Sequence, residues 1–123
     1  MTQENIFHYQ KEFRLESGST LPEFHLFYST YGKLNEQKNN VIWVVHAFSG
    51  SSDFTQWWEG IFGEGRLYDP GKHFIICANI LGGCYGSTGP LSLNPKTGKK
   101  YYHDFPFVTN RDSIRAFDLL RQE

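Results

Sequence analysis

Two runs of consecutive apolar residues interrupt an otherwise mixed pattern, at positions 41–45 (Val-Ile-Trp-Val-Val) and 74–78 (Phe-Ile-Ile-Cys-Ala). A strand that is apolar at every position, without alternation, is typical of a parallel sheet whose two faces are both covered. Residues 9–17 and 24–30 predict two further strands, and the turn residues between them predict an antiparallel hairpin. The pattern therefore predicts a mixed, mostly parallel sheet.

Two other segments predict helices. Residues 54–62 predict a short helix. Trp57 and Trp58 follow Phe54 by three and four residues, a helical spacing that favours core positions over the lining of a substrate entrance. Residues 111–123 predict a longer helix that Asn110 caps. Its expected apolar face consists of Ile114, Phe117, Leu119 and Leu120. A hairpin followed by β-α-β-α predicts an α/β fold.

Composition and charge exclude several classes of protein. With 39% apolar residues, a chain of 123 residues is long enough for one modest core. Twelve basic and thirteen acidic residues give a formal net charge of −1, which argues against binding to nucleic acid or an anionic membrane. The longest apolar run has five residues, far below the roughly 20 that cross a bilayer. The first residues show no secretory pattern, so we expect a cytoplasmic protein.

The cysteines and histidines predict neither a disulfide nor a metal site. Cys77 lies in an apolar run and Cys84 in a glycine-rich segment, and their spacing matches no C-x-x-C pattern, so we expect two reduced thiols. The five histidines are scattered and lack the i, i+4 spacing of helical metal ligands. We expect no metal and no bound cofactor.

Each apolar run ends in a segment of small residues, and these two segments form the candidate site. The strand-end turn, residues 46–50, reads His-Ala-Phe-Ser-Gly. The glycine-rich loop, residues 79–90, reads Asn-Ile-Leu-Gly-Gly-Cys-Tyr-Gly-Ser-Thr-Gly-Pro. Glycine permits positive φ and close backbone approach, and loops at strand ends commonly carry the functional groups of α/β enzymes. The two strand ends predict one site.

The glycine-rich loop also contains the pattern G-x-C-x-G around Cys84, which imitates a nucleophile elbow. An elbow requires a helix directly after the nucleophile, whereas Gly89 and Pro90 predict irregular structure. We therefore expect that Cys84 is not a nucleophile and that the loop shapes a pocket, with its hydroxyl groups bonded to local backbone.

Several segments together resemble the homoserine O-acetyltransferase family of the α/β-hydrolase superfamily. They are the strand-end turn, the Trp57-Trp58 pair, residues 74–90, Asn94 to Gly98, Asp104 to Pro106 and Arg111-Asp112. The resemblance covers roughly residues 10–123. It implies the N-terminal part of an α/β-hydrolase fold, truncated before the nucleophile elbow, in which residues 1–123 form one partial domain without the lid and the C-terminal catalytic portion.

The resemblance also implies an activity. The family transfers acetyl from acetyl-CoA, a co-substrate, to the side-chain hydroxyl of L-homoserine through an acyl-serine intermediate, as a step of methionine biosynthesis. Its Ser-Asp-His triad is not expected within residues 1–123, so the chain alone is expected to be inactive. Complete members are expected to be homodimers that associate through the lid, and neither nucleic acid nor membrane is an expected partner.

The implied site residues lie in the two loops. In α/β-hydrolases one oxyanion donor comes from the loop after the third strand, and the backbone N–H of Phe48 occupies that position. The family usually has leucine there and threonine at Ser49, and both departures keep a main-chain donor. His46 is expected to support the turn. The expected substrate-binding residues are Ala47, Ser49, Gly50, Gly82, Gly83, Cys84 and Tyr85.

Two alternatives stay open at this point. One is a related acyltransferase or hydrolase, such as an enzyme for succinyl or serine acyl transfer. The other is a non-catalytic interaction domain that uses the sheet edge at residues 41–45 for strand addition or self-association.

Overall fold

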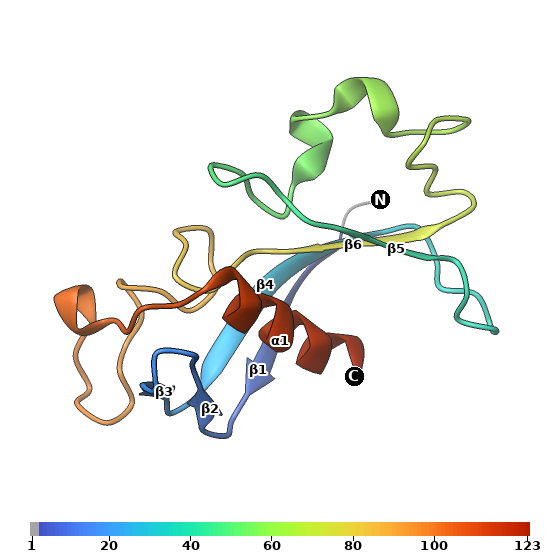
Figure 1. Cartoon of the computed structure of the whole chain (residues 1–123). Helices are drawn as coiled ribbons and strands as arrows, with labels where there is room; N and C mark the ends of the chain where they lie inside the picture. The colour runs from blue at the N-terminus through green and yellow to red at the C-terminus, as the bar shows by residue number, and fades with distance from the viewer. Residues whose placement is uncertain (1–2) are drawn as a thin grey trace. The chain divides into compact units, whose positions relative to one another are not determined.

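The computed structural model describes residues 3–123, with side chains from Asn5 onward. These residues form two compact units: residues 27–78 with the start of the first strand, and residues 6–26 with 79–123. The strands and helices of Figure 1 are β1 (Gln3–Tyr9), β2 (Phe13–Arg14), β3 (Thr20–Leu21), β4 (Phe24–Tyr31), β5 (Val41–Val44), η1 (Phe54–Gln56), η2 (Glu59–Ile61), β6 (Phe74–Ala78), η3 (Tyr102–Asp104) and α1 (Asn110–Arg121).

The main sheet has four strands in the order β1-β4-β6-β5 (Figure 1). β4 runs antiparallel to β6, and β5 runs parallel to β6 with Val44 opposite Cys77. The mixed sheet predicted from the two apolar runs is confirmed, and β6 has the predicted bounds. Because β5 and β6 are parallel neighbours, their carboxyl ends lie at the same edge of the sheet.

The prediction that both runs are covered on both faces is correct for one strand only. In β6 the side chains from Ile75 to Ala78 are buried, as expected. In β5 the Val41 side chain is 46% exposed, and the next residue after the strand, Val45, is 55% exposed. The reason is position, because among the described strands β5 is the last in the order and has β6 as its one neighbour.

The core of the first unit is aromatic. Phe54 is buried and its ring centroid lies 5.3 Å from that of Tyr31, 5.7 Å from that of Phe62 and 5.5 Å from that of Tyr68. These rings meet edge to face, the geometry that aromatic quadrupoles favour. The side chains around Phe54 in this core are Tyr31, Val44, Ile75 and Cys77.

The helix predicted for residues 54–62 is wrong. The structure has two single 3₁₀ turns, η1 and η2, in its place. Asp53 does not cap a helix, because its carboxylate accepts hydrogen bonds from the side chains of Thr55 and Gln56. The core interpretation of the Trp57-Trp58 pair is also wrong, since the two side chains are 42% and 40% exposed.

In the second unit, the strand predicted for residues 9–17 is mostly absent. β1 ends at Tyr9, and only β2 falls inside the predicted range. β2 does not pair with residues 24–30, as the predicted hairpin requires. It pairs antiparallel with β3, which lies inside the predicted turn, and Phe13 lies opposite Leu21. Phe13 then packs edge to face on Phe24, with ring centroids 4.9 Å apart.

Helix α1 begins one residue earlier than predicted, and Thr109 rather than Asn110 is its cap. The Thr109 hydroxyl accepts from the Asp112 amide at 3.1 Å, and the Asp112 carboxylate accepts from the Thr109 amide at 3.0 Å. This reciprocal capping box satisfies two amides that a helix start otherwise leaves unpaired. A single asparagine cap at the next position cannot form it, because the partner three residues on is Ser113.

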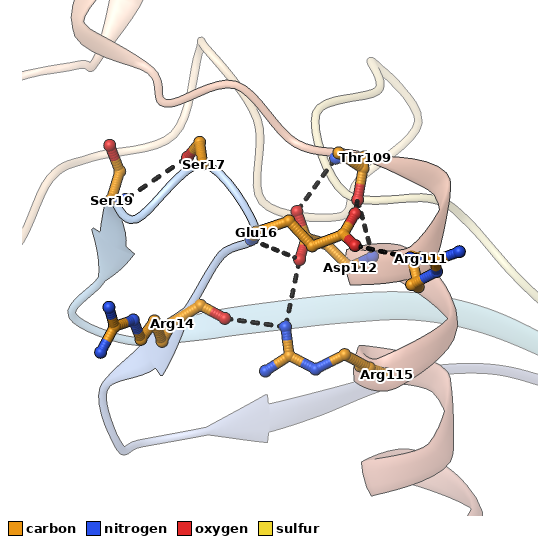
Figure 2. A network of polar contacts seen from close by, with 8 residues as sticks. All are labelled: Arg14, Glu16, Ser17, Ser19, Thr109, Arg111, Asp112 and Arg115. Carbon is orange, nitrogen blue, oxygen red and sulfur yellow. Dashed lines mark hydrogen bonds and ion pairs between the residues drawn. The ribbon is translucent and has the colours of Figure 1, made fainter.

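The buried face of α1 also differs from the prediction. Ala116, Phe117 and Leu120 are buried, whereas Ile114 is 51% exposed. The face is rotated because Asp112 is itself fully buried, held by the contacts that Figure 2 shows. At 12 residues α1 is the longest helix, and within residues 3–123 no helix is long and apolar enough to cross a membrane.

Candidate functional site

The strand-end turn closes directly after β5. The Gly50 amide donates to the Ala47 carbonyl at 2.7 Å, which makes residues 47–50 a β-turn with Phe48 and Ser49 at its centre. Phe48 is 98% exposed. The hydrogen bond that closes the turn uses the Gly50 amide, so the Phe48 amide is not consumed by it. The turn therefore presents main chain at the end of a strand.

Gly50 lets the turn approach the aromatic segment that follows. A β-carbon at this position would lie 2.7 Å from a ring carbon of Trp57 and 3.0 Å from the Ala47 carbonyl oxygen. Contacts under 3.0 Å are essentially never made by a real side chain. Trp57, which is half-exposed, thus packs against the turn and not into the core.

The segment after the turn is tied to the sheet of the same unit. The Ser52 hydroxyl lies 2.9 Å from the Ser29 hydroxyl in β4, and both groups are buried. The Tyr31 hydroxyl donates to the Asp53 carboxylate at 3.2 Å. These contacts hold the turn from its C-terminal side, with neighbours contributed by β4.

His46 contacts the turn from its N-terminal side. Its Nδ1 lies 2.8 Å from the Ala47 carbonyl oxygen, and because a carbonyl only accepts, Nδ1 carries the proton of this bond. The neighbouring thiol of Cys77 is buried, and burial raises its pKa to about 12. Cys77 is therefore a thiol at neutral pH and is excluded as a nucleophile.

The glycine-rich loop lies in the second unit and is braced by its own residues. The Ser87 hydroxyl donates to the Asn79 carbonyl at 2.7 Å, and the Asn79 side-chain amide donates to the Tyr85 carbonyl at 2.7 Å. The Gly82 amide donates to the Thr88 carbonyl at 2.8 Å. The prediction that a loop hydroxyl binds local backbone is confirmed for Ser87.

Two kinds of glycine shape this loop. Gly82 and Gly86 have positive φ values of 82° and 98°, which other residues rarely adopt. Gly89 serves close approach, since a β-carbon there would lie 2.5 Å from the Gly83 carbonyl oxygen. The bracing places Ser87 and Thr88 inside and leaves Cys84 and Tyr85 exposed at the tip.

The structure confirms that the Cys84 pattern is not a nucleophile elbow. Turns follow Cys84, and the first helical residues after it are the 3₁₀ turn η3 and then α1, which starts at Asn110. Cys84 is a free, exposed thiol, and Cys77 is a free, buried one, as the spacing predicted.

The predicted site residues thus fall into two groups. His46, Ala47, Phe48, Ser49 and Gly50 lie together in the strand-end turn of the first unit. The other group, Gly82, Gly83, Cys84 and Tyr85, lies together in the glycine-rich loop of the second unit. Their roles in substrate binding stay predictions. In the described part of the chain no three His, Cys, Asp or Glu side chains gather closely enough to hold a metal ion.

Sequence reasoning missed one residue that contacts the glycine-rich loop. His25, in β4, pairs with Thr88 through both main chain and side chain, although 63 positions separate them. Nothing in the local pattern of residues 24–30 marks this histidine, which is half-buried like several other residues of the strand.

The chain matches proteins of known name over nearly all its length. A homoserine O-acetyltransferase from Cyclobacterium marinum is 55% identical over 121 residues, which are 98% of this chain and 34% of that protein. The crystal structure of homoserine O-acetyltransferase from Bacillus anthracis is 33% identical, with a TM-score of 0.88 over 99% of this chain and 36% of that chain. The structure of esterase E22 is 31% identical, with a TM-score of 0.86 over 99% and 37% of the two chains.

The chain spans about a third of the length of these relatives. No family model matches it. The solved structures share the α/β-hydrolase fold, and the order β1-β4-β6-β5, with a parallel β5-β6 pair, corresponds to part of it. Over the stretch that they share, this chain is a homologue of the homoserine O-acetyltransferases, built on the α/β-hydrolase fold.

Proposed function

We propose that this chain supplies one side of the acyl-transfer site of a homoserine O-acetyltransferase. The observation that carries the proposal is the 55% identity to a relative of that name over 98% of this chain. The proposed reaction moves acetyl from acetyl-CoA to the hydroxyl of L-homoserine, in the cytoplasm, as a step toward methionine. We assign none of the 123 residues to a catalytic triad and expect them to be inactive alone.

The proposed chemistry has two balanced steps. A serine hydroxyl attacks the thioester carbonyl, its proton passes to a histidine, and CoA leaves as the thiol after taking that proton. The homoserine hydroxyl then attacks the acyl-serine and gives its proton to the histidine. The bond from the acyl carbon to the serine oxygen breaks, the histidine returns the proton to that oxygen, and the O-acetyl ester is released. Each step passes through a tetrahedral oxyanion that needs two preorganised N–H donors.

The role proposed for this chain is to provide one of those donors. The Phe48 amide lies in a turn whose closing bond uses the Gly50 amide, and the turn follows a strand end, where this fold carries such a donor. Trp57 and the His46 side chain hold the turn in place from two sides. The exposed tip of the glycine-rich loop, Cys84 and Tyr85, is proposed to line the substrate pocket.

Ester hydrolysis is the second candidate, because esterase E22 matches the same stretch with a TM-score of 0.86. Hydrolysis shares the acyl-serine and the oxyanion donors and differs only in the acceptor, which is water in place of homoserine.

Product analysis of the complete gene product tests the proposal. The protein is mixed with acetyl-CoA, with and without L-homoserine, and thiol release, acetate and O-acetylhomoserine are quantified. If the protein transfers acetyl to homoserine, the molar amount of O-acetylhomoserine formed should nearly equal the molar amount of CoA thiol released. Acetate as the main product in both mixtures would favour the esterase alternative, and no thiol release in either mixture would contradict acyl transfer from CoA.

A further inference from the structure

Residues 51–53, directly after the strand-end turn, are attached to the sheet one by one. In chain order the contacts are the Cys77 thiol to the Ser51 carbonyl oxygen at 4.0 Å, the Ser29 hydroxyl to the Ser52 hydroxyl at 2.9 Å, and the Tyr31 hydroxyl to the Asp53 carboxylate at 3.2 Å. Ser29 lies opposite Cys77 in the antiparallel β4-β6 pair, and Tyr31 is two positions further along β4. All three side chains therefore point to the same face of the sheet. This face carries the aromatic core, since Tyr31 and Cys77 belong to it.

The strand-end turn is thus fixed at both of its ends. On its N-terminal side, Val44 is paired with Cys77 through the parallel β5-β6 ladder. On its C-terminal side, residues 51–53 are fixed by the contacts to β4 and β6. Residues 45–50 span the interval, so a shift of either end moves the Phe48 amide.

The contact between the two serines buries both of its hydroxyl groups beside the core. Ser29 is 1% exposed and Ser52 is 3% exposed. Such a bond adds little net stability, because each hydroxyl gives up its bonds to water, and replacing both partners by apolar groups of similar shape can be nearly neutral. What a buried polar pair does supply is a fixed distance and direction, here between β4 and the segment after the turn.

We propose that Ser29 and Ser52 are positioning residues that set the place of the Phe48 amide. The catalytic consequence rests on the function proposed above, in which this amide is an oxyanion donor, whereas the attachment of the turn is a property of the first unit alone. The two serines act through residues 45–50 and not by contact with the substrate. The expected signature is a loss of rate without a comparable loss of stability.

The double variant Ser29→Ala with Ser52→Ala, made in the complete gene product, tests the proposal. Both hydroxyls are removed together, so neither loses the other while staying buried, and the Tm should fall by less than about 2 °C. In the acetyl-transfer assay kcat should fall about tenfold with the KM values unchanged, because a displaced donor weakens binding of the oxyanion but not of the substrates. The loss stays below the roughly hundredfold effect of removing a donor.

Thr30→Val is the matched control. Thr30 lies between Ser29 and Tyr31 in β4, is also buried, and points to the opposite face of the sheet. Its substitution removes one buried hydroxyl from the same strand with little change of shape, and kcat should stay close to the wild-type value. An equal loss of kcat in Thr30→Val would assign the effect to the strand as a whole and overturn the role of the serine pair.

Two results for the double variant itself would also overturn the proposal. An unchanged kcat would show that the remaining contacts are enough to place the turn. A loss of kcat together with a Tm as low as that of a core variant such as Phe54→Ala, or a failure to fold, would show that the pair stabilises the unit and has a merely structural role.

Hydrogen exchange at the Gly50 amide separates this inference from the proposed reaction. This amide closes the turn by donating to the Ala47 carbonyl, and the Tyr68 amide, which donates to the Ile61 carbonyl in the same unit, is the reference. The double variant should lower the protection factor of Gly50 about three- to tenfold and leave Tyr68 unchanged. Faster exchange with a wild type that transfers no acetyl would contradict the reaction only. Unchanged exchange with an active wild type would contradict the positioning only.

Discussion

Different interactions stabilise each of the two units internally. In the first unit a cluster of aromatic and aliphatic side chains, centred on Phe54, packs over the sheet. In the second unit the N-terminus of α1 is held by polar contacts, in which the buried Asp112 accepts from the Glu16 and Thr109 amides and pairs with Arg115 (Figure 2). The first unit should therefore respond mainly to changes in volume, whereas the start of α1 in the second unit should respond to changes in charge and pH.

The two loops of the candidate site follow the same division. The strand-end turn is held from outside, by Trp57 and by contacts to β4, and it presents main chain next to exposed side chains. The glycine-rich loop is held from within, by Ser87 and Asn79, and by the polar partner His25. A turn of the first kind suits a fixed backbone donor, whereas a loop of the second kind owes its shape to hydrogen bonds of its own side chains.

The largest expected effect is on the stability of the first unit. Phe54→Ala removes a buried ring from a cluster of aromatic side chains, and such changes cost about 3–5 kcal/mol in the free energy of unfolding. Phe107→Ala is the matched control, since that ring is 76% exposed and its removal should cost less than about 0.5 kcal/mol. Urea unfolding measures both, and similar costs for the two variants would contradict the assignment of the core.

The next effect concerns catalysis by the strand-end turn. Phe48→Pro removes the proposed oxyanion donor, and proline is compatible with the first central position of a β-turn. Losing one such donor lowers kcat about a hundred- to a thousandfold. Phe48→Ala keeps the amide and removes only an exposed ring, so its kcat should stay close to the wild-type value.

Steady-state kinetics of the complete gene product check this pair of variants, with circular dichroism to verify folding. An active Phe48→Pro variant would show that the donor lies elsewhere. Equal losses in both variants would assign the effect to the ring, as a wall of the pocket, and not to the amide.

The sheet itself was predictable because its signal is local. Five consecutive apolar residues end at a polar boundary, and β6 occupies those positions, Phe74–Ala78. The cap of α1 was misplaced by one residue because Thr109 and Asn110 are both good caps. The choice between them depends on Asp112, whose carboxylate returns to the Thr109 amide and reaches the Glu16 amide 96 positions away.

The candidate site was predictable to the same extent. The turn and the loop are marked by their own small residues, so their positions could be read locally. What holds them could not: Trp57 packs on Gly50 because no helix forms there, and His25 meets Thr88 across 63 positions. Such contacts depend on the arrangement of strands and have no periodicity in the sequence.

A smaller effect is expected from Asp112, and it should depend on pH. Burial alone would raise the pKa of Asp112, but hydrogen bonds from the Thr109 and Glu16 amides and the charge of Arg115 lower it below its usual 3.8. Asp112→Ala leaves those donors unpaired, at a cost of about 1.5–3 kcal/mol near neutral pH.

The sign of the pH dependence follows from the lowered pKa. The stabilisation by Asp112 is fully present above pH 3.8 and is lost as the pH falls through the folded-state pKa, since the protonated group accepts more weakly. The gap between the wild type and Asp112→Ala in urea unfolding should therefore narrow in acid. Phe54→Ala should show no such narrowing, and a gap of constant size for Asp112→Ala would contradict the polar account of the second unit.

The smallest expected effect is the loss of stability caused by Gly50→Ala. It tests whether glycine is needed at position 50 because Trp57 lies close to it, and not because glycine is flexible. Gly50→Ala places a methyl group 2.7 Å from a ring carbon of Trp57, so the half-exposed ring must move, at a cost of about 1–2 kcal/mol. Gly60→Ala is the matched control, because no atom lies within 4 Å of its added carbon. In thermal unfolding, the Tm of Gly50→Ala should be lower than that of the wild type, and the Tm of Gly60→Ala should be unchanged.

A double variant with Trp57→Ala tests whether Trp57 holds the turn. If it does, the double variant should lose less stability than the sum of the two single variants, because the clash is then gone. Additive losses would mean that the turn is held by the Ser52 and Asp53 contacts alone, and that the exposed indole is free for another role.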